Sequence, residues 1–429
     1  MVVLNRIKCL ILTSTICLAS CTPGSSETIN SEEEPIVIEL WQIDGGEKEK
    51  IYMEAINRFE EKNHGVKVRA LRIPNDDYKQ RMIVAMSGGA PPDVFTSWGG
   101  GWLKQFVDAD RVMDLTEQDI PFDQFFDVSL GTATFNDEVY GLPLGLTLGL
   151  FFYNKQMFKE FGLDVPETYD DFLHVVEVIK ENDVYPISLS NQTRWPGAYF
   201  LMYYADRLAE EGLFEEAYLR TGRGFDDEVY INSGEYIQEL VELGAFNPGF
   251  NGMSYDSGQG RALLYNEHAA MSLTNSSLIS NIRNEVPEFE EKVGIFTFPI
   301  IEGGQGDPTN IVGIANPVWS ISSESEHPEL AVELIKELSS LETAEAYINR
   351  TGSMSSVEAA QIEDPFVQQF ADIANNATAI QASYDQSLQA ELAELHKITT
   401  QEIFAGIKTP EEAARAMEKK AQELESNEN

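Results

Sequence analysis

The chain has 429 residues, 43% of them hydrophobic and 10% aromatic, so it is long enough to form two or three hydrophobic cores. Its 71 acidic residues against 30 basic ones give a formal charge of −41. This charge favours a well-solvated acidic surface and argues against nucleic acids and anionic membrane surfaces as partners, because both repel a polyanion.

The N-terminus has the pattern of a secretory signal. Arg6 and Lys8 precede an apolar run over residues 9–19, and small residues lead directly into Cys21. The segment resembles the bacterial lipobox, in which the cysteine is acylated and becomes the new N-terminus. We therefore predict a signal peptide over residues 1–20 and lipidation of Cys21, the alternative being an ordinary signal peptide with an incidental cysteine.

Residues 21–35 are rich in Ser, Thr, Glu, Pro and Gly and nearly free of apolar side chains, which predicts a flexible linker. Cys9 and Cys17 lie in the predicted signal peptide, so the mature chain keeps only Cys21 and forms no intramolecular disulfide. The predicted location is the cell membrane, through a lipid anchor, on its extracellular side (the periplasm in a Gram-negative cell).

The first part of the mature chain alternates strands and helices, which predicts an α/β lobe with a parallel sheet. Ligands of such sheets bind beyond the carboxyl ends of the strands, here residues 41–46 and 97–102. The candidates from these two stretches are Trp41, Asp44, Ser97 and Trp98. The predicted strands are residues 36–43, 66–73 and 93–96, and the predicted helices are residues 47–62 and 77–87.

Residues 140–155 form the stretch around which the chain is organised. Residues 142–153 carry no charge, yet the run is shorter than the ~20 apolar residues that span a membrane. With Pro143 and several glycines it favours a buried extended segment over a helix. We interpret it as the first crossing between two lobes, with Thr147 as the polar side chain that faces a ligand cleft.

The rest of the chain predicts a second lobe. Trp195 lies on a polar turn after one predicted strand, which makes it a candidate cleft residue. Residues 311–321, with Gly313 and Trp319, predict a further crossing. The predicted helices are residues 168–182, 198–212, 229–243, 258–266, 329–339 and 388–404, with others from 343 and 365, and the predicted strands are residues 186–190, 269–273 and 293–299.

Motifs of catalysis and of metal or cofactor binding are missing from the sequence. The five histidines have no metal-ligand spacing, and the chain has no GxSxG, P-loop or GxGxxG motif. Four of the five tryptophans lie at predicted strand ends or turns, and no motif implies a cofactor.

Several motifs resemble, in the same order, those of the bacterial extracellular solute-binding proteins that serve sugar ABC transporters. They are GGAPPDV (88–94), YGLP (140–143) with YNK (153–155), PETYDDF (166–172), AAM (269–271), and FAG (404–406) with TPEEA (409–413). The resemblance implies a type II periplasmic-binding-protein fold of class α/β, like that of maltose-binding proteins, with two α/β lobes joined by a three-segment hinge. It adds Asn275, Tyr384 and Asp385 as ligand-binding candidates.

The resemblance also implies the lobe boundaries. Residues 36–146 and 275–315 would form the first lobe, and residues 147–274 and 316–429 the second. In maltose-binding proteins a carboxylate occupies the position that matches Thr147, so the resemblance does not imply maltose itself.

The hypothesis that follows is a monomeric, lipid-anchored receptor that delivers a carbohydrate, with an oligosaccharide favoured, to the permease of an ABC importer. A second hypothesis keeps the receptor fold for a polyol or another non-sugar solute, and a third is a secreted carbohydrate-active enzyme with a carboxylate pair. The net charge disfavours an anionic ligand, unless a local basic cluster, for example around Arg194, overrides it.

Overall fold

The structure, a computed structural model, describes residues 35–428 except 211 and 359. The predicted signal peptide (1–20), Cys21 and the linker up to residue 34 lie outside the described residues. Within the described part, no helix combines the length and the apolar character needed to cross a membrane. Residues from 36 onward form one compact unit, and its described part contains two large sheets and a two-stranded one made of β4 and β5.

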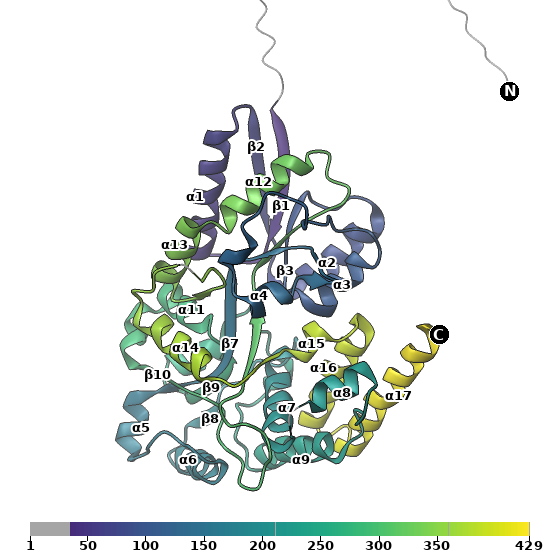
Figure 1. The fold of residues 1–429 in the computed structure, drawn as a ribbon. Coiled ribbons are helices and arrows are strands. Elements are labelled where there is room, and N and C mark those ends of the chain that lie inside the picture. The colour runs from purple at the N-terminus through teal and green to yellow at the C-terminus, as the bar shows by residue number, and fades with distance from the viewer. Residues whose placement is uncertain (1–34, 211, 359, 429) are drawn as a thin grey trace, which may run out of the picture. The chain divides into compact units, whose positions relative to one another are not determined.

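The first sheet has five strands in the order β2, β1, β3, β12, β6. Figure 1 labels the first three of them, β2, β1 and β3. β1 runs parallel to β2 and β3, whereas β12 runs antiparallel to β3 and β6. Apolar side chains of α1, α12 and α13 share one core with the sheet, and those of α2 and α3 share another. We call this assembly the first lobe; its elements are β1 (Ile36–Gln42), α1 (Glu47–Lys62), β2 (Val66–Arg72), α2 (Asn75–Gly88), β3 (Val94–Ser97), α3 (Gly100–Val107), α4 (Asp127–Gly131), β4 (Thr134–Phe135), β5 (Glu138–Val139), β6 (Leu142–Pro143), β12 (Val318–Ile321), α12 (Pro328–Leu338) and α13 (Leu341–Thr351).

The second sheet is built around β7, the longest strand. β9, β10, β11 and β13 all pair antiparallel with β7, and β8 and β14 extend the sheet on either side. We call this sheet and its helices the second lobe; its elements are β7 (Gly145–Asn154), α5 (Lys155–Phe161), α6 (Tyr169–Glu181), β8 (Tyr185–Ile187), α7 (Trp195–Leu208), α8 (Leu213–Leu219), α9 (Glu228–Glu242), α10 (Gln259–Tyr265), β9 (Ala269–Asn275), α11 (Leu278–Glu285), β10 (Val293–Phe296), β11 (Ile311–Ala315), β13 (Met354–Ser355), α14 (Pro365–Asn376), β14 (Ile380–Ala382), α15 (Tyr384–Ser387), α16 (Ala390–Phe404) and α17 (Pro410–Glu428).

The chain passes between the two sheets at three places. It leaves the first sheet between Pro143 and Gly145, returns between Ala315 and Val318, and leaves again between α13 and β13. The uncharged run 142–153 thus belongs to two sheets, because β6 ends one and β7 begins the other. The predicted fold class, two α/β lobes joined by three segments, is confirmed.

The strand pairing contradicts part of the predicted lobe boundaries. Residues 275–315 were expected in the first lobe, but β10 and β11 pair with β7 in the second. Residues 316–429 were expected in the second lobe, but β12 lies between β3 and β6, and α12 packs on α1. A buried strand is apolar whichever sheet it joins, so its sequence does not disclose its partner.

β7 is uncharged along its whole length and mostly apolar, because both of its faces are covered. Leu148, Leu150 and Phe152 belong to the core formed with α10, α11 and α14, whereas Phe151 belongs to the core formed with α6 and α7. Gly149 leaves room for the ring of Tyr199, since a Cβ there would lie 2.5 Å from that ring. The glycine therefore lets α7 approach the central strand closely.

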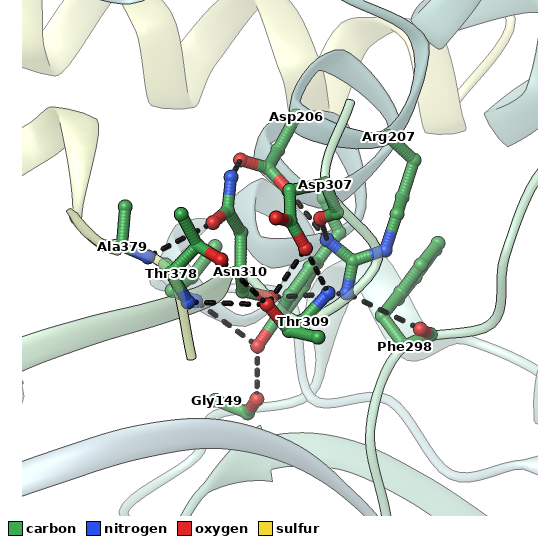
Figure 2. A network of polar contacts seen from close by, with 11 residues as sticks. Gly149, Asp206, Arg207, Phe298, Asp307, Thr309, Asn310, Thr378 and Ala379 are labelled. Carbon is green, nitrogen blue, oxygen red and sulfur yellow. Dashed lines mark hydrogen bonds and ion pairs between the residues drawn. The ribbon is translucent and has the colours of Figure 1, made fainter. Parts of the chain in front are cut away.

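A buried polar network fixes the loop between β10 and β11 against α7 (Figure 2). Arg207, 2% exposed, pairs with Asp206 at 2.5 Å and donates to the carbonyl oxygens of Phe298 and Asn310 at 3.3 and 3.0 Å. One turn earlier on α7, the hydroxyl of Tyr203 donates to Gly149 O and accepts from Val312 N–H. α7 thereby holds β7 and β11 together beside the crossings.

Candidate functional site

A cavity of about 1160 Å³ lies between the two lobes and is lined by residues of both. Its volume exceeds the roughly 300–1,000 Å³ that is usual for sites of drug-sized molecules. The first-lobe wall comes from the loops after β1 and β3, as expected for carboxyl ends of strands, and from α2 and α3. The size and position fit a solute of several rings.

The second-lobe wall carries three aromatic rings. Trp195 packs edge-on against Tyr255 and Tyr199, with ring centroids 4.6 and 6.0 Å apart. Trp195 begins α7, and Tyr199 follows one turn later, so the helix presents both rings on one face. This aromatic group, defined by Trp195, Tyr199 and Tyr255, gives the cavity an aromatic surface on the side of the second lobe.

Six of the predicted site residues line the cavity. Asp44 follows β1, and Trp98 follows β3. The Nζ atom of Lys79 lies 4.6 Å from the centroid of the Trp98 ring. Thr147 is almost fully buried, and its hydroxyl donates to Ile314 O at 3.2 Å. The six are Asp44, Trp98, Thr147, Trp195, Asn275 and Asp385.

The five other predicted site residues do not line the cavity. Trp319 is fully buried in the first-lobe core, where its ring centroid lies 5.0 Å from that of Tyr52. Its position on β12 directs the side chain into this core and away from α2. Tyr384 stacks on Phe214 at 4.1 Å inside the second lobe. Burial in a core, not exposure to a cleft, explains these two aromatics.

The remaining three make contacts within the sheets or with the helices that cover them. Ser97 Oγ lies 3.3 Å from Ser320 Oγ on the neighbouring strand. Gly313 sits where a Cβ would meet Ile380 at 2.7 Å. Trp41, half-buried, packs against the core formed by α2 and α3.

Sequence reasoning missed most of the charged and tyrosine residues of the cavity. Lys79, Tyr199 and Lys397 lie within helices, where the apolar period identifies the core face but not which polar side chains reach a cleft. Tyr255 and Arg261 come from a loop and the short helix α10. Arg261 lies over the Tyr255 ring at 5.2 Å and donates to Glu285 at 2.6 Å.

Lys48 links the two lobes at the cavity, through an ion pair within the first lobe and a hydrogen bond to the second. Lys48 of α1 is 3.9 Å from Asp44 and donates to Ser277 Oγ of the second lobe at 3.3 Å. Burial acts to lower the pKa of Lys48, but Tyr347 and Asp44 outweigh it and raise that pKa above its ordinary value. The ammonium therefore stays charged and holds the loop after β1 to the second lobe.

A second pair joins α2 to α15. Lys79 Nζ lies 3.6 Å from Asp385 Oδ2, and burial lowers the pKa of Lys79 to about 8 despite that carboxylate. Burial opposes ionisation of Asp385 as well, but Lys79 and Lys397 hold its pKa below the ordinary value. Near neutral pH both partners are charged.

Some cavity residues keep hydrogen-bonding capacity that the described chain does not use. Buried side-chain atoms without a partner in the described part include Nε1 of two tryptophans and oxygens of three polar residues. Buried polar atoms are normally satisfied, so these atoms mark polar positions in the wall of the cavity. They are Trp102 Nε1, Trp195 Nε1, Thr193 Oγ1, Asn316 Oδ1 and Gln386 Oε1.

The two lobes, the three crossings and the cavity between the lobes define a solute-binding protein of the type II class. The family model described as bacterial extracellular solute-binding protein matches residues 45–345, and the chain belongs to this family.

Two curated relatives extend the comparison. An uncharacterised ABC transporter extracellular-binding protein of Pyrococcus horikoshii is 25% identical over 345 residues, covering 78% of this chain and 74% of the relative. The multiple sugar-binding protein of Streptococcus mutans is 24% identical over 350 residues, covering 80% of each.

Two solved structures share the fold. One, from work on xylan utilisation by the thermophilic bacterium Caldanaerobius polysaccharolyticus, has a TM-score of 0.85 at 26% identity and covers 90% of this chain and 100% of its own. The other is a chitin oligosaccharide binding protein, with a TM-score of 0.83 at 22% identity, covering 91% and 99%.

Proposed function

We propose that this protein is the receptor of an ABC importer, binds a carbohydrate of several sugar units between its lobes, and delivers it to the permease. The observation that carries the proposal is the aromatic group Trp195, Tyr199 and Tyr255, which faces a wall of polar and charged side chains across the cavity. Relatives named for multiple sugars and for melibiose, raffinose and stachyose support the same class of ligand.

The chemistry of the two walls matches that of a sugar. Ring faces rich in C–H groups pack on aromatic side chains, and the hydroxyl edges exchange hydrogen bonds with carboxylates and amides. We assign ligand contact to Asp44, Trp98, Thr147, Trp195, Asn275 and Asp385, all of which line the cavity. The protein acts as a monomer and changes the position of its ligand, not its covalent structure.

Transport requires that the permease distinguish the loaded receptor. A ligand that touches both walls stabilises the arrangement in which the lobes are closest, so the sugar shifts the receptor toward a closed state. The three crossings, at 143–145, 315–318 and between α13 and β13, are the segments about which the lobes move.

Titration calorimetry against a panel of neutral and acidic di- to pentasaccharides tests the binding step. We expect at least one member to bind with a Kd in the micromolar range or tighter and to raise the Tm at saturation. Binding of a polyol or another non-sugar solute, with no response to any saccharide, would show that the carbohydrate assignment is wrong.

We further propose that Cys21 carries the lipid that holds the receptor at the outer face of the membrane, after removal of residues 1–20. The support is the sequence pattern of a basic region, a short apolar run and small residues before the cysteine. In cells, Cys21→Ala should shift the protein from the membrane fraction to the soluble fraction. Retention of the variant in the membrane would contradict lipid anchoring.

A further inference from the structure

The charge of the cavity lining differs from that of the chain. Acidic residues outnumber basic ones 71 to 30 over the whole sequence. The cavity is lined by six basic and five acidic residues. A surface with the average composition of this chain would be strongly acidic. The cavity lining is therefore poorer in acidic residues and richer in basic ones than the chain as a whole.

Pairing accounts for part of this balance. Asp44 is paired with Lys48, and Glu285 with Arg261, so these four side chains cancel in charge. A different group, which we call the Lys79 cluster, contains Lys79, Arg194, Asp385, Glu394 and Lys397. Glu394 forms ion pairs with both Arg194 and Lys397, and Asp385 forms one with Lys79. Three cations thus share two carboxylates, which leaves one surplus positive charge.

Lys79 is the member of the Lys79 cluster with unused capacity. Its ammonium can donate three hydrogen bonds, and the carboxylate of Asp385 uses at most part of this capacity because the contact is long. The nearest carboxylate oxygen, on Asp385, is 3.6 Å away, and the other neighbour is the face of Trp98. The side chain is 28% exposed, so a ligand in the cavity can reach it.

Arg194 is held in place at the same end of the cavity. It adopts a left-handed backbone with φ of +71°, an unusual conformation for a non-glycine residue that structures tend to keep at functional sites. Its guanidinium donates to Glu394 and to Gln401 at 3.2 Å. Gln401 thus gives the Arg194 guanidinium a second partner besides Glu394, which fixes its position at this end of the cavity.

We propose that the carbohydrate is acidic: it carries a uronic acid whose carboxylate binds at the Lys79 cluster and receives hydrogen bonds from Lys79. This inference rests on the proposed function and names its substrate class. A single surplus positive charge matches one carboxylate, whereas a phosphate monoester carries about 1.5 to 2 negative charges at neutral pH.

The acidic surface does not prevent binding of such an anion. Repulsion by distant charges is screened beyond about 8 Å at physiological ionic strength, whereas the partly buried cluster acts at contact distance. The overall charge thus affects the rate of encounter, and the cluster determines which sugar remains bound.

Calorimetry with matched pairs tests the proposal: each uronic-acid-bearing oligosaccharide is compared with its carboxyl-reduced, neutral counterpart. For the pair that binds tightest, we expect the acidic member to bind about tenfold more tightly or better, and the advantage to shrink as salt is raised. Lys79→Gln should abolish the advantage while changing the Kd of the neutral member much less.

Lys419→Gln is the control, because Lys419 lies on α17, is 79% exposed and does not line the cavity, yet its loss changes the net charge equally. It should retain the preference for the acidic member. Equal or tighter binding of the neutral member by the wild-type protein overturns the inference and leaves the proposed function standing. Failure of every pair to bind overturns the proposed function instead, and this inference with it.

Discussion

Asn316 donates its backbone N–H to the carbonyl oxygen of Gly145 over 2.8 Å, and this bond joins two of the three crossings between the lobes. Gly145 begins β7, where the chain enters the second sheet, and Asn316 lies between β11 and β12, where it returns to the first. A Cβ on Gly145 would overlap the carbonyl oxygen of Asn316 and lie 2.9 Å from the Tyr347 hydroxyl. The two crossings therefore touch through backbone alone.

Gly145→Ala should destabilise the protein by about 1–3 kcal/mol, because the added methyl has no space between the two crossings. Chemical denaturation at neutral pH measures the change. Gly131→Ala is the matched control, since Gly131 lies on α4 with nothing within 4 Å of the added Cβ. A loss of stability no larger than that of the control would show that the two crossings can move apart to make room for the methyl group.

Trp195→Ala should weaken carbohydrate binding by about tenfold or more, because it removes the central ring of the aromatic group. Calorimetry on a saccharide that binds the wild-type protein gives the ratio. Trp41→Ala removes another half-buried tryptophan that lies outside the cavity, and its Kd should stay near that of the wild type. Equal losses in both variants would indicate a general effect on folding.

The two-lobe architecture was predictable because short stretches of sequence indicate its first strands and the first crossing. Turn residues and alternating apolar residues mark β1, β2 and β3, and the uncharged run 142–153 is too short for a membrane and too apolar for a surface. The later topology was not predictable in the same way. β9 to β12 are short apolar strands, and only tertiary pairing decides that β11 joins β7 and β12 joins β3.

The site shows the same division. Trp98 and Trp195 were predicted from their positions after strands, because a large aromatic ring at the end of a strand or on a turn indicates contact with a ligand. The same rule failed for Trp319, because β12 is buried on both faces and the ring enters the core. Lys79 gave no signal at all, since a lysine on an amphipathic helix is ordinarily a solvated side chain, and only the fold brings it to Asp385.

Arg207→Met should cost about 3–5 kcal/mol of stability, because it leaves the carboxylate of Asp206 partly buried without its cation. Burial already raises the pKa of Asp206 above its ordinary value, although Arg207 opposes the shift. The double variant Asp206→Asn with Arg207→Met should recover part of the loss, which a double-mutant cycle by denaturation measures. Strictly additive losses would mean that the two side chains do not interact.

Binding of an acidic sugar should weaken above pH 8. Lys79, with a pKa of about 8, faces Asp385 on α15 and Glu394 and Lys397 on α16, and above that pH its ammonium loses the proton that the ligand carboxylate requires. We expect the association constant to fall about tenfold from pH 7 to pH 9. Calorimetry at both values measures it. The Lys79→Gln variant should show a flat profile, and a decline of equal size in that variant would assign the effect to another group.

Acid should destabilise the protein through His396. This imidazole is 1% exposed beside the ring of Tyr384, and burial lowers its pKa to about 4 although Asp385 opposes the shift. The unfolded chain, with a pKa near 6.5, takes up the proton first. Between pH 6.5 and 4 the unfolded state therefore binds more protons, and stability falls as the pH falls, by about 3 kcal/mol over the window.

His396→Gln removes this titration and keeps a polar side chain of similar size. The free energy of unfolding, measured by urea denaturation from pH 7 to pH 4, should decline less steeply in the variant, and the two curves should converge by about 3 kcal/mol toward pH 4 relative to their separation at pH 7. Other carboxylates titrate in both proteins and cancel in the difference. Parallel curves would show that the imidazole becomes protonated in the folded state as readily as in the unfolded one.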